Sequence, residues 1–193
     1  MSTLDKIPVH LLTNAAMFEE IHQAKSSFVT LYSALANELT PGDLSGVHPA
    51  SQGYKISKGN ELQRCPYQVL DIIRDFDPDF GFNIRLLNWW GRGMYIFLFF
   101  GRINRRIFSS PHLFADLRKQ EYFLARTSSP WDYTTIIDLG ETSPIRQDSE
   151  VEDHVRKFGH LQLVKKIDYT GDFPSLKQRL REQVLIILNL YNK

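Results

Sequence analysis

Residues 82–100 constrain the fold more strongly than any other part of the chain, because two apolar runs meet there around the dipeptide Gly91-Arg92. A two-residue connection that begins with glycine is typical of the type II′ turn of a β-hairpin. With these two residues as the turn, Trp90 lies opposite Gly93, and every further pair follows from that one. Because parallel strands cannot be joined so tightly, the stretch predicts two antiparallel strands.

Both faces of this hairpin are mostly apolar in the predicted register. Directly opposed residues of an antiparallel pair share a face. One face then carries Trp90, Asn88, Leu86, Ile84, Tyr95, Phe97 and Phe99. The other face carries Trp89, Leu87, Arg85, Met94, Ile96, Leu98 and Phe100. A sheet with one hydrated face alternates polar and apolar residues, so we expect the hairpin to be covered on both sides, or to use one face as a ligand groove or a homodimer contact.

Helices and further strands flank the hairpin. The expected elements are a long helix from Thr13 or Asn14 to residue 40, a strand Tyr67–Arg74, a helix capped by Ser110, a strand Trp131–Leu139, a helix from a Ser149-x-x-Glu152 capping box to Gly159, a strand Leu161–Tyr169 and a last helix from Pro174. The punctuated stretch 41–63 predicts a long loop. We therefore predict an α+β fold, with an antiparallel sheet centred on the 82–100 hairpin and N-terminal, central and C-terminal helices, as one domain over residues 1–193.

Length and composition exclude several classes of protein. A chain of 193 residues can bury a core without a disulfide or a metal. The net charge is +1, so no global field attracts nucleic acid or membranes. The longest strongly apolar run, Met94 to Phe100, is seven residues, whereas a membrane-spanning helix needs about 20. The N-terminus has no secretory signal and Cys65 is the single cysteine, so we expect a cytoplasmic protein.

Arg85 is the one charged residue within the hairpin strands. It cannot lose its proton, so if it is buried it needs a carboxylate. If the strand Tyr67–Arg74 folds back against the first hairpin strand, a register that sets Ile72 beside Ile84 places Asp71 opposite Arg85. We predict this ion pair and expect it to be structural rather than catalytic.

Aromatic and charged residues near the hairpin tip are the candidate ligand-binding residues. They are Tyr54, Lys58, Asp71, Arg85, Trp89, Trp90 and Arg92. Aromatic side chains supply contact area, and arginine fixes an anionic group. We therefore predict a non-enzymatic module that binds a small anionic ligand or a protein partner. The alternative is an enzyme that acts on a small acidic substrate with Asp71 as acid or base.

The segment 85–119 holds seven basic residues and one acidic residue, with aromatic residues between them. Such a pattern is typical of single-stranded nucleic acid binding. The residues that would contact phosphates are Arg92, Arg102, Arg105 and Arg106. Acidic residues of the segment 61–79 are expected neighbours that neutralise these bases, so nucleic acid is the less favoured partner.

Motifs for cofactors and catalysis are missing from the sequence. The chain has no Walker A loop, no G-x-S-x-G elbow and no H-E-x-x-H. His154 and His160 flank Gly159 at a helix end, where histidine more often interacts with the helix dipole than with a metal. We expect no cofactor and no metal site, and we interpret Cys65 as a packed thiol.

Three short segments carry a resemblance to a known family. They are Lys58-Gly59-Asn60-Glu61-Leu62, Pro66-Tyr67-Gln68-Val69-Leu70-Asp71 and Trp89-Trp90-Gly91. With them the chain resembles an uncharacterised family of bacterial proteins that have KG-x-x, PY-x-V-L-D and WWG segments. The family has no assigned activity, so the resemblance transfers no catalytic residue. It implies that the region 58–93 is the family's signature.

Overall fold

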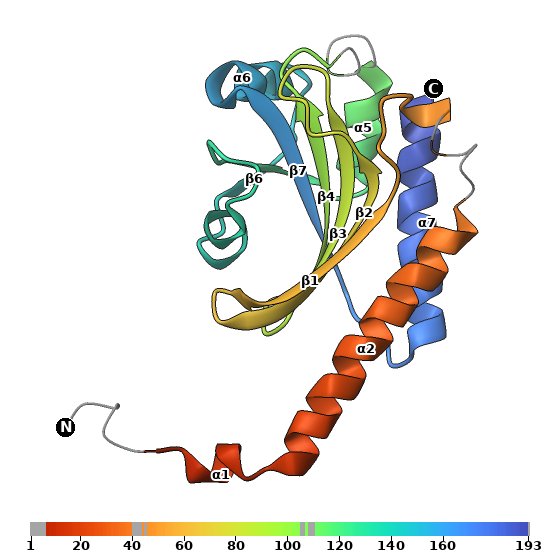
Figure 1. Cartoon of the computed structure of the whole chain (residues 1–193). Coiled ribbons are helices and arrows are strands. Elements are labelled where there is room, and N and C mark those ends of the chain that lie inside the picture. The colour runs from red at the N-terminus through yellow and green to blue at the C-terminus, as the bar shows by residue number, and fades with distance from the viewer. Residues whose placement is uncertain (1–6, 40–43, 45, 105–106, 108–110, 193) are drawn as a thin grey trace, which may run out of the picture.

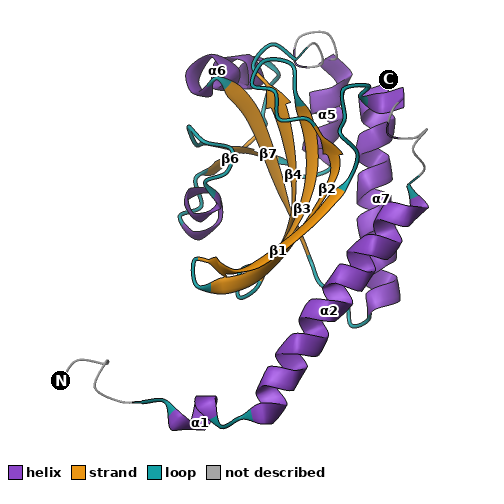
Figure 2. Ribbon diagram, in the orientation of Figure 1, coloured by secondary structure: helices purple, strands orange, loops and turns teal. Residues whose placement is uncertain are grey.

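An antiparallel β-sheet forms the centre of the structure, and helices pack against it (Figures 1 and 2). The computed structural model describes residues 7–39, 44, 46–104, 107 and 111–192. The helices are α1 (Val9–Leu12), α2 (Ala15–Glu38), α5 (Pro111–Lys119), α6 (Ser149–Phe158), α7 (Phe173–Asn192) and a short π-helical segment, η2 (Thr134–Asp138). The strands are β1 (Lys55–Leu62), β2 (Cys65–Arg74), β3 (Phe82–Trp89), β4 (Gly93–Gly101), β5 (Phe123–Ala125), β6 (Thr142–Pro144) and β7 (His160–Ile167). They lie in the order β1-β2-β3-β4-β7-β5-β6 with antiparallel neighbours, which confirms the predicted α+β class.

Apolar side chains are buried on both faces of the sheet. Helices α2 and α7 lie across one face (Figure 1), where Leu35, Val184 and Leu86 belong to one buried apolar cluster. The segment 126–141, which contains η2, covers the opposite face, where Tyr133 packs with Phe97. The expectation that the hairpin is covered on both sides is confirmed. A fully buried large apolar side chain contributes roughly 1.5–3 kcal/mol, so these two layers are the main source of stability.

The β3–β4 hairpin is shifted by one residue from the predicted register. Trp89, rather than Trp90, pairs with Gly93. The amide of Arg92 donates to the carbonyl of Trp89 at 3.0 Å and closes the turn, in which Gly91 has a φ of 79°. Trp90 belongs to the connection because the pairing of β3 with β4 ends at Trp89 and Gly93, and the Trp90 amide donates instead to the carbonyl of Pro66 in β2. The turn therefore has three residues instead of two.

Because of this shift, each β4 side chain points to the face of the sheet opposite to the predicted one. A slip of one residue turns every side chain of a strand to the other side. The face toward residues 126–141 carries Arg85, Leu87, Trp89, Tyr95, Phe97 and Phe99. The face toward α2 and α7 carries Ile84, Leu86, Asn88, Met94, Ile96, Leu98 and Phe100. Both faces remain apolar, so the slip changes the partners and not the layer arrangement.

The predicted strand over Trp131–Leu139 is wrong, and this range instead contains η2. The carboxylate of Asp132 accepts the amide of Thr135 at 3.1 Å and its hydroxyl at 2.7 Å, which favours a helical turn. Tyr133 and Ile136, three residues apart, then face the sheet together. The β-branched residues in this range favour a strand by propensity, but local hydrogen bonds and packing on the sheet decide its conformation.

The stretch 41–63, which was predicted as a loop, ends in the edge strand β1. Lys58 pairs with Gln68 of β2, and most side chains of β1 are exposed or half-buried. An edge strand with charged side chains and few large apolar ones resists pairing with other chains, and for the same reason it gives little sequence signal. Positions 41–43 and 45 of this region, and the predicted helix cap Ser110, lie outside the described residues.

Two of the predicted helix boundaries are confirmed by local caps. Asn14 accepts an amide of the first turn of α2 at 3.0 Å, and Gly159 ends α6 with a φ of 73°. The predicted capping box of Ser149 and Glu152 is wrong, because α6 has Asp148 at its N-cap and no side-chain cap there. None of the described helices combines the length and the apolar composition that a membrane crossing requires.

Candidate functional site

Asp71 and Arg85 form the ion pair that the sequence predicts. The two residues pair across β2 and β3. Nε and Nη2 of Arg85 donate to Oδ1 and Oδ2 of Asp71 at 2.7 and 2.8 Å, a bidentate arrangement that is among the strong hydrogen-bonded pairs. The register then breaks at a bulge, so that Ile73, rather than Ile72, lies beside Ile84.

The ion pair belongs to a wider network beneath the segment 126–141. Asn83 donates to Asp71 at 3.1 Å, and Nη1 of Arg85 donates to the Tyr133 hydroxyl at 2.6 Å. The guanidinium also lies 4.8 Å from the ring centre of Trp131. Burial opposes the charge of Arg85, but the bonds to Asp71 and Tyr133 outweigh it and raise the pKa of Arg85. Both oxygens of Asp71 are occupied and its side chain is 4% exposed, so the geometry favours a structural role over acid–base chemistry.

The seven candidate residues do not gather in one pocket, because strand side chains alternate between the two faces of a sheet. Those on the face toward residues 126–141 are Asp71, Arg85, Trp89 and Arg92. Those on the face toward α2 are Lys58 and Trp90. Tyr54 precedes β1 and is exposed, whereas Trp89 is fully buried. The prediction of a single site at the tip is therefore wrong, and a binding role for individual members stays a prediction.

Most basic residues of the segment 85–119 are paired with carboxylates. The pairs are Arg85–Asp71, Arg92–Asp138, Arg102–Asp79, Arg118–Asp148 and Lys119–Asp116. Arg105 and Arg106 lie outside the described residues. Pairing reduces the charge that is free to attract phosphates, which weakens the nucleic-acid alternative for the described part of this segment.

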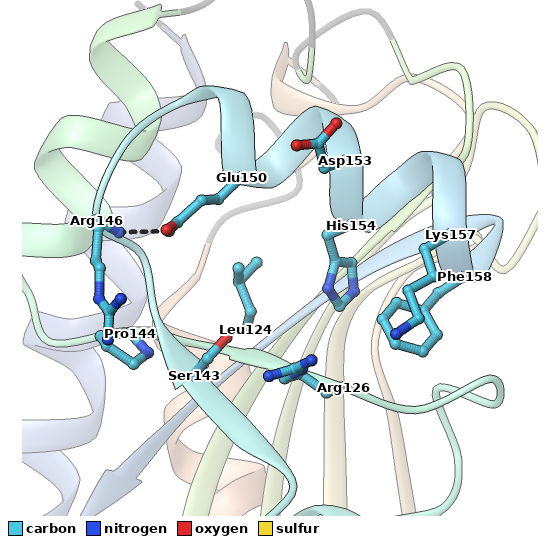
Figure 3. Close-up of a pocket in the computed structure, with 10 residues that line it drawn as sticks. All are labelled: Leu124, Arg126, Ser143, Pro144, Arg146, Glu150, Asp153, His154, Lys157 and Phe158. Atoms are coloured by element: carbon cyan, nitrogen blue, oxygen red, sulfur yellow. Dashed lines mark hydrogen bonds between the residues drawn. The ribbon is translucent and has the colours of Figure 1, made fainter.

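A basic pocket of about 310 Å³ opens between β5, β6 and α6 (Figure 3). Three separate parts of the chain supply its walls, and side chains from all three point toward the same space (Figure 3). The lining residues are Leu124, Arg126, Ser143, Pro144, Arg146, Glu150, Asp153, His154, Lys157 and Phe158. The pocket thus combines apolar walls with cations, a hydroxyl and an imidazole, which is the composition of many small-molecule sites.

The carboxylates of this pocket are engaged within the protein, whereas its cations have no carboxylate partner among the described residues. Glu150 accepts the backbone amide of Arg146 at 2.8 Å (Figure 3). Asp153 pairs at 2.9 Å with Arg156, which does not line the pocket. In the part of the chain that the structure describes, no carboxylate lies within ion-pair distance of the three pocket cations, Arg126, Arg146 and Lys157. Their charge is therefore available to a ligand.

His154 lies on the inner wall of the pocket and is 6% exposed. Its Nε2 atom has no hydrogen-bond partner among the described residues. Burial lowers the pKa of His154 to about 4, and the charges of His160, Arg126 and Lys157 act in the same direction. Near pH 7 the imidazole is neutral and offers one donor and one acceptor. In the described ranges, no group of three or more His, Cys, Asp and Glu side chains is placed to hold a metal ion.

We expect the free energy of unfolding to fall by up to about 2 kcal/mol between pH 7 and pH 5 because of His154. Its pKa is depressed to about 4 in the folded state, against about 6.5 in an unfolded chain, so only the unfolded state takes up a proton in this range. Urea denaturation at pH 7, 6 and 5 measures the decline. A His154→Gln variant should show a shallower decline, and equal declines in the two proteins would contradict the assignment.

Comparison of the chain with protein-family models, curated proteins and solved structures finds no match. The resemblance of the region 58–93 to a bacterial family therefore stays a prediction, and it transfers no function to the chain.

Sequence reasoning missed the basic pocket. Its cations, Arg126, Arg146 and Lys157, come from three separate segments, and none of them stands in a recognisable motif. The only member that the sequence singled out is His154, which was assigned to a helix end. Residues that meet through strand pairing have no fixed spacing in the sequence by which they could be recognised. The walls of this pocket come together only through the pairing of β5 with β6 and β7.

Proposed function

We propose that the chain is a non-enzymatic module that binds a small organic anion in the pocket between β5, β6 and α6. One observation carries the proposal: Arg126, Arg146 and Lys157 line one cavity and have no carboxylate partner among the described residues. Unpaired cations that share a concave, partly apolar space are suited to hold the negative group of a ligand.

The chemistry of each lining group supports this proposal. The guanidinium groups of Arg126 and Arg146 can each donate two parallel hydrogen bonds to a carboxylate or a phosphate, and Lys157 adds a point charge. Ser143 and the neutral His154 offer further hydrogen bonds. The apolar walls would contact the uncharged part of the ligand, which favours an organic anion over an inorganic ion.

Binding is favoured over catalysis because the pocket holds no idle carboxylate. Glu150 and Asp153 already accept hydrogen bonds from protein groups, which orient them toward the protein rather than toward a substrate. The same argument applies to Asp71, whose two oxygens are taken by Arg85 and Asn83. An enzyme that uses Asp71 as acid or base would first have to break the buried ion pair.

Titration calorimetry with phenyl phosphate, benzoate and the neutral benzamide tests this proposal. We expect the two anions to bind and benzamide not to bind. Arg126→Ala and Arg146→Ala should each weaken anion binding at least tenfold, because a hydrogen bond to a charged group is worth about 1.5–3 kcal/mol. Arg146→Ala keeps the backbone amide that Glu150 accepts, so the pocket wall should persist.

Arg179→Ala is the matched control, because Arg179 is exposed on α7 and does not line the pocket. It should bind the anions as the wild-type protein does. Equal binding of benzamide, or unchanged anion affinity in an Arg126→Ala/Arg146→Ala double variant, would overturn the proposal.

We further propose a cytoplasmic location, which the state of the single cysteine supports. The Cys65 sulfur accepts a hydrogen bond from Arg92 at 2.9 Å, and the chain has no second cysteine to oxidise it. A lone thiol is typical of reducing compartments. Cell fractionation that recovers the full chain outside the cytoplasm would contradict this location.

A further inference from the structure

A second pocket, of about 380 Å³, lies next to the basic pocket and is lined by residues from the end of α5, from β5 and from β7. The two pockets share Pro144 of β6 as a lining residue, and Figure 3 shows this proline in the basic pocket. Its two neighbours divide between them, because Ser143 lines the basic pocket and Ile145 lines the second one. Pro144 is exposed, so the boundary between the two pockets is open to solvent and offers a path for a bound molecule.

The second pocket also carries cations that no carboxylate neutralises directly. Lys165 and Lys166 of β7 line it, and in the part of the chain that the structure describes neither has a carboxylate within ion-pair distance. Lys165 donates instead to the uncharged side chain of Gln183 at 2.9 Å. Glu121 lines the same pocket and raises the pKa of Lys165, but it does so from beyond ion-pair distance. The two lysines are therefore available to a negative group of a ligand.

Two further features of the second pocket favour a negative group over a neutral one. Burial lowers the pKa of Lys165, and an anion beside it would offset this effect by stabilising the charged form. The Tyr122 hydroxyl is buried and has no hydrogen-bond partner among the described residues. Burial raises the pKa of Tyr122, so the hydroxyl keeps its proton and can donate to an acceptor. Arg118 lines the pocket as well, but it is paired with Asp148, so the two lysines are the main attraction.

We infer that the ligand of the basic pocket is an elongated organic dianion, which lies across Pro144 and places its second negative group against Lys165 and Lys166. This inference rests on the proposed function, because the first negative group is the one that Arg126 and Arg146 hold. From Ser143 to Ile145 an extended chain advances about 7 Å, so the two negative groups lie at least that far apart. A dicarboxylate or a bisphosphate with an aliphatic centre has this form, and its centre would contact the exposed Pro144.

One ligand with two negative groups is favoured over two separate anions. Once the first group is bound, the second contact becomes intramolecular, so the two pockets together bind more tightly than either pocket alone. The gain depends on length, because a linker that cannot span the two sites adds nothing. A dianion that is too short should therefore bind like a monoanion, which separates bridging from a general effect of charge.

Titration calorimetry with sebacate, sebacic acid monoamide, succinate and succinamate tests this inference. Sebacate has a carboxylate at each end of a long aliphatic chain, and its monoamide has the same length with one neutral end. We expect sebacate to bind at least about tenfold more tightly than its monoamide, because its second carboxylate reaches the lysines. Succinate is too short to cross Pro144, so it should show no such gain over succinamate.

A Lys165→Met/Lys166→Ala double variant should remove the gain of sebacate and leave the affinity for the monoamide unchanged. Methionine retains much of the aliphatic chain of the half-buried Lys165, and Lys166 is exposed, so the fold should persist. Lys58→Ala is the matched control, because Lys58 is exposed on β1, at the opposite edge of the sheet from β6. This variant should keep the full gain.

Failure of this inference differs from failure of the proposed function. Equal binding of sebacate and its monoamide, with both weakened by Arg126→Ala, would overturn the dianion and leave the basic pocket as an anion site. A gain that survives in the double variant would also overturn the assignment of the second negative group to Lys165 and Lys166. Absence of binding by all four ligands would overturn both proposals.

Discussion

Replacement of Asp71 by alanine is expected to reduce the free energy of unfolding by about 3–5 kcal/mol, because it leaves a buried guanidinium without its counter-charge. Arg85 is 16% exposed and donates to both oxygens of Asp71, so the variant leaves two of its hydrogen-bond donors without their acceptor. Asn83 would lose one hydrogen-bond acceptor in the same variant, which adds to the cost. Urea denaturation followed by circular dichroism measures the loss.

Asp138→Ala is the matched control for Asp71→Ala. Asp138 also pairs with an arginine, Arg92, but the two side chains are 29% and 26% exposed. Exposed ion pairs contribute about 0–1 kcal/mol, so this variant should unfold nearly as the wild-type protein does. Replacement of both Asp71 and Arg85 by leucine should cost less than Asp71→Ala, because no charge is then left buried. Equal losses in Asp71→Ala and Asp138→Ala would contradict the structural role of the buried pair.

The Asp71–Arg85 pair shows which features a sequence can predict. A permanent charge within two apolar runs demands a nearby carboxylate, and only one segment of the chain could supply it across a turn. This requirement fixes the pairing of β2 with β3 more securely than the hairpin turn fixes the pairing of β3 with β4. Both a two-residue and a three-residue turn place Gly91 where a positive φ is needed, so the sequence alone could not exclude the register that was one residue off.

The elements that were missed depend on context rather than on local pattern. β1 has few large apolar residues because it lies at the edge of the sheet, and η2 is rich in β-branched residues although it is helical. In η2 the hydrogen bonds of Asp132 to Thr135 outweigh strand propensity. The basic pocket is the extreme case, because Arg126, Arg146 and Lys157 meet only after three separate segments have packed. Local sequence patterns therefore predicted the sheet and the helices that cover it. The position of the basic pocket depends on how these elements pack, which local patterns do not show.

Trp89→Ala is expected to reduce the free energy of unfolding by about 3–5 kcal/mol, the usual cost of removing a buried aromatic side chain. Trp89 is fully buried, its indole donates to the carbonyl of Leu62 at 2.9 Å, and the guanidinium of Arg92 lies 4.6 Å from its ring centre. The variant would thus open a cavity on the face toward residues 126–141 and remove the indole hydrogen bond to the carbonyl of Leu62. Denaturation followed by far-ultraviolet circular dichroism measures the loss without depending on tryptophan fluorescence.

Trp90 supplies the control, because adjacent residues of an extended chain point to opposite faces of the sheet. Trp90 is half-buried, and its indole donates to Gln68 at 3.0 Å on the α2 side. Trp90→Ala should therefore cost about 1–2 kcal/mol, less than Trp89→Ala, because less apolar area leaves the core. In the register that takes Gly91-Arg92 as a two-residue turn, Trp90 would be a paired strand residue and the two losses should be similar. A larger loss for Trp90→Ala than for Trp89→Ala would contradict the three-residue turn and the face that it assigns to Trp89.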